Sequence, residues 1–229
     1  MKYLSIRVKL MILTLITLIP LILLQAFNVD ENFHRSSDQK LDASVEFAHA
    51  VSSYFYNYVE ELWIQESIIG NTIMSNINDK FEIQSYLDSV VGSNENNLQR
   101  LSWVNPDGII TESTRQYMIG QSIADRDYYK RIKAGQDMVI SDLVESYVDN
   151  SLVVPVARGI RKNGELVGIL VYSVSVDRLV SNIPGLTLNK GDVLTLVDRN
   201  GRVVYSSLNN SLSFNERQLP GDDSDWQAL

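Results

Sequence analysis

Hydrophobic and polar positions divide the chain into an uncharged run, a long helical segment and a β-rich region. Residues 10–27 (LMILTLITLIPLILLQAF) contain no charge. As a helix, such a run is long enough to cross a hydrocarbon core of ~30 Å. Three basic residues precede it: Lys2, Arg7 and Lys9. The positive-inside rule then predicts a membrane helix over 10–28, with residues 1–9 in the cytoplasm and the rest exported.

A cleaved signal peptide is the alternative interpretation of this run. It would require a small-residue cleavage site after a shorter apolar core. Ala26 has no second small residue two positions before it. We therefore favour an uncleaved anchor.

A period near 3.5 over residues 29–76 predicts a long helix with an apolar packing seam. Ser52 and Glu66 interrupt the seam, so it is not a regular coiled coil. We favour packing of this helix along its own domain, and pairing with a second copy in a homodimer remains open. The apolar positions of the seam are Leu41, Val45, Ala48, Phe55, Val59, Leu62, Ile69 and Ile73.

Residues 77–185 combine two further helices with alternating apolar strands, which predicts an α+β domain with an antiparallel sheet. Asn105-Pro106-Asp107-Gly108 and Asn163-Gly164 are typical of hairpin turns. Pro155, inside a strand, indicates an edge position or a bulge. The expected helices are 79–91 and 125–134, with a short exit helix over 177–182, and the expected strands are 98–104, 109–112, 139–143, 151–160 and 166–176.

A second module is expected to start near Asp192. The sequence VLTLVDRNGRVVYSS repeats the strand, turn and strand order of LQRLSWVNPDGIITES. A domain of this kind needs roughly a hundred residues. Residues 190–229 therefore predict the start of a truncated second lobe.

Composition excludes several classes of function. The chain has no cysteine and two histidines, so thiolate and histidine-rich metal sites are excluded. Beyond the three N-terminal basic residues it has 17 basic and 28 acidic residues, a net charge of −11, which disfavours nucleic-acid binding. We find no cofactor motif and no catalytic constellation, and we expect this chain not to be an enzyme.

The order of these segments resembles the double Cache domain, a PAS-like extracytoplasmic sensor of bacterial transmembrane receptors. The most specific motifs are GQSIADRDYYKRIKAG and VVPVARGIRKNGELVGILVYSVSVDRL, together with WVNPDGIITES. The resemblance implies two PAS-like lobes on one long helix, with the ligand in the membrane-distal lobe. It also implies an output domain, absent here, of histidine kinase, chemoreceptor or diguanylate cyclase type.

The resemblance implies that Arg126 holds a ligand carboxylate, with Tyr128 and Tyr129 beside it. A guanidinium pairs bidentately with a carboxylate, and the start of a helix favours an anion. The alternative is that Arg126 only pairs with Asp127 or Asp142 at the surface. Asp125 or Ser122 could cap the helix.

In amino-acid-binding members of the family, an aspartate on the last strand meets the ligand ammonium, and that position here is Ser173. This difference favours a ligand that is only an anion, such as a small mono- or dicarboxylate. An acidic residue from elsewhere could still supply the charge: Asp142, Glu145 or Asp149. Further candidates for the pocket are Arg158, as a second cation, and the aromatic side chains Tyr147, Trp103 and Tyr172.

These features together predict the sensor region of a receptor in the bacterial cell membrane, with one span and the sensor outside the cytoplasm. The expected ligand is a small organic acid or an amino acid, and the signal would pass through helices across the membrane. The alternative is a membrane-anchored dimerisation or partner-interaction module without a small ligand.

Overall fold

The structure is a computed structural model of the chain. It describes residues 6–76, 79–92, 100–176, 183, 188, 192–209 and 211–220, without the side chains of 6–17, 20–40 and 76. Contacts divide the chain into two units, residues 1–54 and 55–229. The predicted exit helix at 177–182 and the acidic loop after residue 220 lie outside the described residues.

Helix α1 (Ile6–Asn76) is continuous over 71 residues. It confirms the long helix predicted over residues 29–76, and it is unbroken from Ile6 to that segment. The predicted membrane span, 10–28, falls in the part of α1 where only Leu18 and Ile19 have described side chains. Among the described residues, no helix combines the length and hydropathy required to cross a membrane.

The second unit contains an antiparallel sheet in the order β2-β1-β6-β5-β3, with β4 also paired to β5. Its central strands are the two arms of a long hairpin and are mostly apolar on both faces, because both faces of the sheet are covered. The strands are β1 (Arg100–Val104), β2 (Ile110–Ser113), β3 (Met138–Ile140), β4 (Val144–Glu145), β5 (Leu152–Lys162) and β6 (Glu165–Ser175).

Both predicted hairpin turns are confirmed. Asn163 and Gly164 have φ of 52° and 88°, the left-handed pair that a two-residue hairpin requires. In the other turn, the amide of Gly108 donates to the carbonyl oxygen of Asn105 at 2.9 Å. These local turns set the register of β1 with β2 and of β5 with β6.

Pro155 does not occupy the expected edge strand or bulge. It lies in β5, an interior strand, and the register shift falls at Ile160 and Arg161 instead. The carbonyl of Pro155 accepts from the amide of Ser141, beyond the end of β3. The side of Pro155 that lacks an N–H therefore faces the gap between β3 and β4, where no ladder bond is lost.

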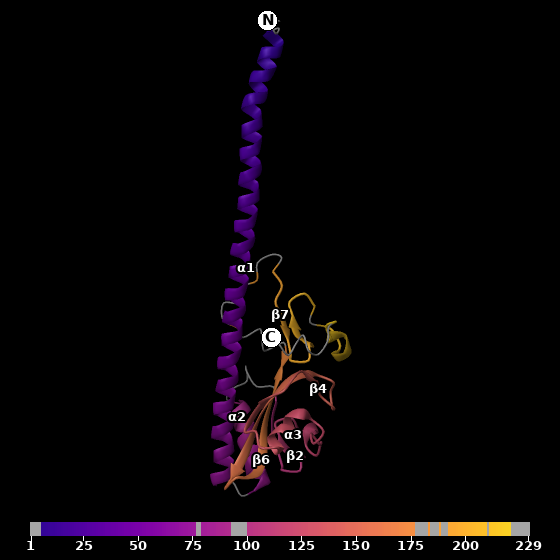
Figure 1. The fold of residues 1–229 in the computed structure, drawn as a ribbon. Helices are drawn as coiled ribbons and strands as arrows, with labels where there is room; N and C mark the ends of the chain where they lie inside the picture. Colours follow the sequence, from indigo (N-terminus) through magenta and orange to yellow (C-terminus); the bar gives the residue numbers. More distant parts are fainter. Residues whose placement is uncertain are drawn as a thin grey trace. The chain divides into compact units, whose positions relative to one another are not determined.

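Helices cover opposite faces of the sheet (Figure 1). On one face, α3 (Asp127–Lys133) packs into an apolar cluster through Tyr128, Tyr129 and Ile132. On the other face, α2 (Lys80–Gly92) buries Leu87, and the end of α1 lies near enough to β6 for the hydroxyl of Tyr172 to reach Gln65 at 3.5 Å. The sheet thus separates two sets of side chains that alternate along each strand.

Gly168→Ala is expected to lower the stability of the fold by about 1–3 kcal/mol, the usual cost of overpacking a core. A Cβ at this position would lie 2.2 Å from the indole of Trp103, a rigid ring that is itself buried. Chemical denaturation measures the change. Gly92→Ala is the matched control, because a Cβ at Gly92 meets nothing within 4 Å.

The region after residue 191 contains the hairpin of β7 (Thr195–Val197) and β8 (Val203–Ser206), followed by η2 (Phe214–Arg217). The predicted strand, turn and strand are confirmed, with Gly201 at φ 72° in the turn. Asp198 and Arg199 of this turn contact Leu143 and Asp142 of the main sheet region. A second complete lobe is not present in the described residues.

Candidate functional site

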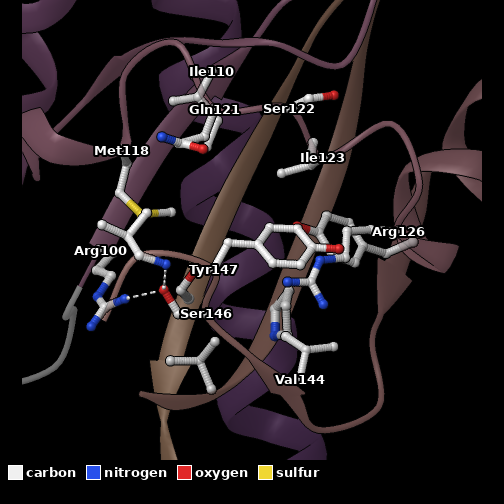
Figure 2. Close-up of a pocket in the computed structure, with 15 residues that line it drawn as sticks. Arg100, Ile110, Met118, Gln121, Ser122, Ile123, Arg126, Val144, Ser146 and Tyr147 are labelled. Carbon is white, nitrogen blue, oxygen red and sulfur yellow. Dashed lines mark hydrogen bonds between the residues drawn. The ribbon is translucent and has the colours of Figure 1, made fainter. Parts of the chain in front are cut away.

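A small pocket lies on the α3 side of the sheet, between the sheet, the segment before α3 and the segment around β4 (Figure 2). Its free volume is about 40 Å³, enough for a few water molecules. The polar and charged residues that line it are Arg100, Gln121, Ser122, Arg126, Ser146, Tyr147 and Ser173, with Tyr128 and apolar side chains completing the wall.

Arg126 is the N-cap residue of α3, directly before the helix. One guanidinium nitrogen donates to the backbone carbonyl of Glu145 at 2.8 Å. The guanidinium carbon lies 3.6 Å from the ring centroid of Tyr147, a cation–π contact. Arg126 therefore joins the start of α3 to the segment that begins at β4.

The surface ion pairs considered as an alternative for Arg126 are made by other arginines. Asp127 pairs with Arg131 at 3.6 Å, and Asp142 pairs with Arg199 at 3.0 Å. Among the ion pairs of the described residues, none includes Arg126. The groups of the described residues that interact with its charge include the carbonyl of Glu145, the ring of Tyr147 and the nearby Asp125.

The expected capping of α3 by Asp125 or Ser122 is wrong. The N-cap position has no side-chain hydrogen bond. Ser122 instead accepts from the amide of Ala124 at 3.3 Å, in the turn before the helix.

Tyr147 covers Arg126 and is held by Asp125. Its hydroxyl donates a short hydrogen bond to the Asp125 carboxylate. This bond lowers the pKa of Asp125 and raises the pKa of Tyr147, because it stabilises the ionised carboxylate and the neutral phenol. The side chain of Tyr147 is nevertheless exposed, so it can turn outward without uncovering buried apolar surface.

Arg100, which we did not single out in the sequence, forms the other end of the pocket. Its guanidinium contacts Asp149 at 2.5 and 3.2 Å and Ser146 at 3.3 Å. Partial burial raises the pKa of Asp149, but hydrogen bonds from Ser146, Ser151 and Arg100 outweigh it and hold the pKa well below its ordinary value. The one signal in the sequence is a charged residue at the start of the strand LQRLSWV.

Ser173 and Tyr128, two of the residues predicted to bind the ligand, line the pocket, and their role in binding stays a prediction. Ser173 pairs in register with Arg100 on one side and Pro155 on the other. The position where the resemblance would place an aspartate is therefore next to a guanidinium. Among the residues that the structure describes, no aspartate or glutamate lines the pocket.

The other three predicted ligand-binding residues lie away from the pocket. Tyr129 is buried, and its hydroxyl donates to the carbonyl of Pro106 at 2.9 Å. Trp103 and Arg158 are at positions of β1 and β5 that share the α1 face with Tyr172, which is also not a lining residue. Arg126, Tyr128, Tyr147 and Ser173 are the predicted residues that the structure brings together.

Metal binding has no support at this site. Within the described residues, no group of three or more histidine, aspartate or glutamate side chains is placed to hold a metal ion. The donors directed into the pocket are guanidinium, hydroxyl and amide groups, which suit an anion with oxygen atoms.

Comparison with known proteins gives a match to one family model. The model described as "Cache domain" matches residues 31–227. A search of curated proteins found no relative.

Solved structures with the same fold are sensor and ligand-binding domains. The sensor domain of the V. cholerae histidine kinase DctB has a TM-score of 0.54 and 18% identity, over 69% of this chain and 62% of that domain. The ligand-binding domain of the Campylobacter jejuni chemoreceptor Tlp3, in complex with 4-methylisoleucine, has a TM-score of 0.53 and 14% identity, over 72% and 71%. The ligand-binding domain of the Pseudomonas aeruginosa PAO1 amino acid chemoreceptor PctB, in complex with L-Arg, has a TM-score of 0.57 and 15% identity. The match covers 71% of this chain and 68% of that domain.

Proposed function

Because its residues 31–227 match the family model, the chain belongs to the Cache domain family, and we propose that it is the ligand-sensing region of a bacterial transmembrane receptor. The proposed ligand is a small carboxylate. Residues 77–185 would form the sensing lobe and 190–229 the start of a second lobe. We also propose that residues 10–28 anchor the chain in the cell membrane with the lobe outside the cytoplasm, on the basis of the uncharged run and the basic residues before it.

The observation that carries this proposal is the charge of the pocket. Two guanidinium groups, those of Arg100 and Arg126, face it, and no carboxylate lines it. Arg100 already pairs with Asp149, whereas Arg126 has no ion pair among the described residues. An anion gains most where a cation is not yet paired, so we assign the ligand carboxylate to Arg126.

Ligand entry requires the Tyr147 ring to leave Arg126. The free volume of about 40 Å³ is too small for an organic acid of several carbon atoms. Once the ring turns outward, the carboxylate can take its place on the guanidinium, with Tyr128 and Ser173 lining the remaining space. The ring contact and the ligand thus compete for one cation.

Signal transmission requires that the ligand bind two states of the protein with different affinity. The segment from β4 to β5 carries Tyr147 and leads directly into the sheet that packs against α1. We propose that release of Tyr147 from Arg126 shifts this segment and, through β5, the contact between the sheet and α1.

A partner-interaction module without a small ligand is the second candidate. Ile64 and Ile68, one turn apart on α1, are 61% and 58% exposed. Apolar side chains at this spacing suit a contact with another helix, such as that of a second copy. The two functions are compatible, since this face of α1 is separate from the pocket.

A thermal-shift panel on the 229-residue chain in detergent tests the proposed ligand class. We expect small mono- and dicarboxylates to raise the melting temperature by roughly 5–10 °C at a hundredfold excess over Kd. Amides of the same carbon skeleton are the matched controls and are expected to have no effect. Equal stabilisation by acids and amides, or no stabilisation by either, would contradict a carboxylate site. If no ligand of the panel stabilises the chain and the chain forms a stable dimer, the second candidate is favoured.

A further inference from the structure

Glu66 lies where α1 meets the sheet, on the face opposite the pocket. It shares a helix face with the buried Ile69 and Ile73, and its own exposure is 0%. Four residues later, Gly70 allows so close an approach that an added Cβ would lie 2.2 Å from Cδ1 of Ile160. The carboxyl group of Glu66 is therefore enclosed in a tightly packed seam between α1 and the sheet.

The polar groups around this seam are poorly satisfied. Among the described residues, neither carboxyl oxygen of Glu66 has a hydrogen-bond partner, and the same holds for Nε of Arg158. One terminal nitrogen of Arg158 contacts the sulfur of Met138 at 2.8 Å instead. A buried carboxylate without such partners costs several kcal/mol, so the seam favours the neutral acid.

The charge state of Glu66 follows from this environment. Burial raises the pKa of Glu66 well above its ordinary value, while Arg158 and the backbone of Tyr172 oppose the shift only in part. The Tyr172 backbone is near the carboxyl group but does not meet it in hydrogen-bond geometry. Glu66 is therefore protonated while α1 is packed against the sheet, an arrangement called the seated state.

We propose that Glu66 is a proton-binding site that couples the seating of α1 on the sheet to pH. In the seated state the carboxyl group is neutral. Ionisation creates a buried charge that is relieved when this part of α1 separates from the sheet enough to admit water, or when the carboxylate turns toward Arg158. Either change alters the contact between the sheet and the long helix, independently of the carboxylate pocket.

Other titratable and charged groups lie on the same face of the sheet or on the helices that cover it. Arg158 stays charged throughout the physiological range, and the pKa of Tyr172 is raised by burial first and then by Glu66. One carboxyl oxygen of Glu112 accepts a hydrogen bond from Thr111 at 2.5 Å, and its other oxygen is buried without a hydrogen-bond partner among the described residues. The groups that face this seam are Arg158 from β5, Tyr172 from β6, Tyr86 from α2, Glu112 from β2 and Tyr58 from α1 itself.

The direction of the pH effect is fixed by linkage. A raised pKa in the folded state means that the folded protein binds the proton more tightly than the unfolded chain. The resulting stabilisation is complete below the ordinary pKa of a glutamate and is lost as pH rises through the raised value. A rise in pH therefore weakens the packing of α1 against the sheet.

Glu66→Gln in the full chain, in detergent, tests the proposal. We expect the melting temperature of the unsubstituted chain to fall as the pH rises above the ordinary pKa of a glutamate, and Glu66→Gln to remove the part of that decrease that this group causes. Glu61→Gln, at an exposed glutamate of the same helix, is the matched control and should keep it. Identical pH dependence in Glu66→Gln and the unsubstituted chain would overturn the proposal.

An infrared measurement on the unsubstituted chain also tests the proposal, and its negative outcome does not depend on whether Glu66→Gln folds. The proposal requires the band of a protonated carboxyl group to persist at pH values above the pKa of ~4.3 of a free glutamate and to be lost in Glu66→Gln. Absence of this band overturns it, whatever the stability of Glu66→Gln.

Discussion

Arg126→Ala is expected to abolish the thermal stabilisation that small carboxylates give the chain. A charged hydrogen-bond partner removed from a bound anion typically costs about 2–4 kcal/mol, which corresponds to roughly 30- to 1,000-fold in Kd. The stability of the unliganded chain should change little, because Arg126 is only half-buried and makes no ion pair among the described residues. Calorimetric titration with the best acid of the panel measures the loss.

Arg131→Ala is the matched control for this prediction. Arg131 lies on the same short helix, but its guanidinium pairs with Asp127 and Gln136 and does not line the pocket. It has the same change of charge, so any general effect of net charge on acid binding should appear in both variants. Unchanged affinity in Arg126→Ala would remove the basis for assigning the carboxylate to this residue.

Asp149→Ala is expected to have the largest effect on stability among the residues around the pocket. It leaves the guanidinium of Arg100, whose side chain is 9% exposed, without its carboxylate. Breaking a buried pair costs about 3–5 kcal/mol. Because the Asp149 side chain is 35% exposed, water screens part of the interaction, and we expect about 2–3 kcal/mol.

Urea unfolding measures this change, with Asp127→Ala as control. Asp127 also pairs with an arginine, but its side chain is 68% exposed, and its removal should cost less than about 1 kcal/mol. The contribution of Asp149 should be constant above the ordinary pKa of an aspartate, since its pKa in the folded state is lowered. It is lost as pH falls through that lowered value. Equal costs for the two alanine variants would mean that Arg100 does not depend on its carboxylate.

Local sequence patterns predicted the helices and strands of residues 79–176 well. The Asn163-Gly164 turn and the turn at Asn105–Gly108 follow from the backbone preferences of a few adjacent residues, so the hairpins they connect are correct. The apolar period of α1 likewise predicted the helix, and Glu66 was visible as a break in its seam. The break marks the one acidic side chain on the buried helix face that the structure describes.

The pocket was predictable only in part, because it depends on contacts between distant segments. Arg126 and Ser173 were found through the resemblance to a family. Arg100 was missed since its partner, Asp149, is 49 residues away, and no local pattern joins them. Arg158 was placed in the pocket because a strand position alone does not reveal which face of the sheet it takes; pairing with Leu170 puts it toward α1.

Pro155 has a consequence for how fast the pocket can exchange its occupant. Between Ile140 and Val144 the amide of Ser141 still donates to Pro155, but Pro155 has no N–H for a return bond, so β3 and β4 do not merge into one continuous strand. The segment with Tyr147 can therefore swing without first breaking the hydrogen bonds of β3. On the proposed function, entry and exit of the ligand would need rotation of the exposed Tyr147 side chain and would leave the pairing of β3 with β5 intact. If the chain binds the proposed carboxylate, occupancy of the pocket would then follow rapid changes in the concentration of that ligand.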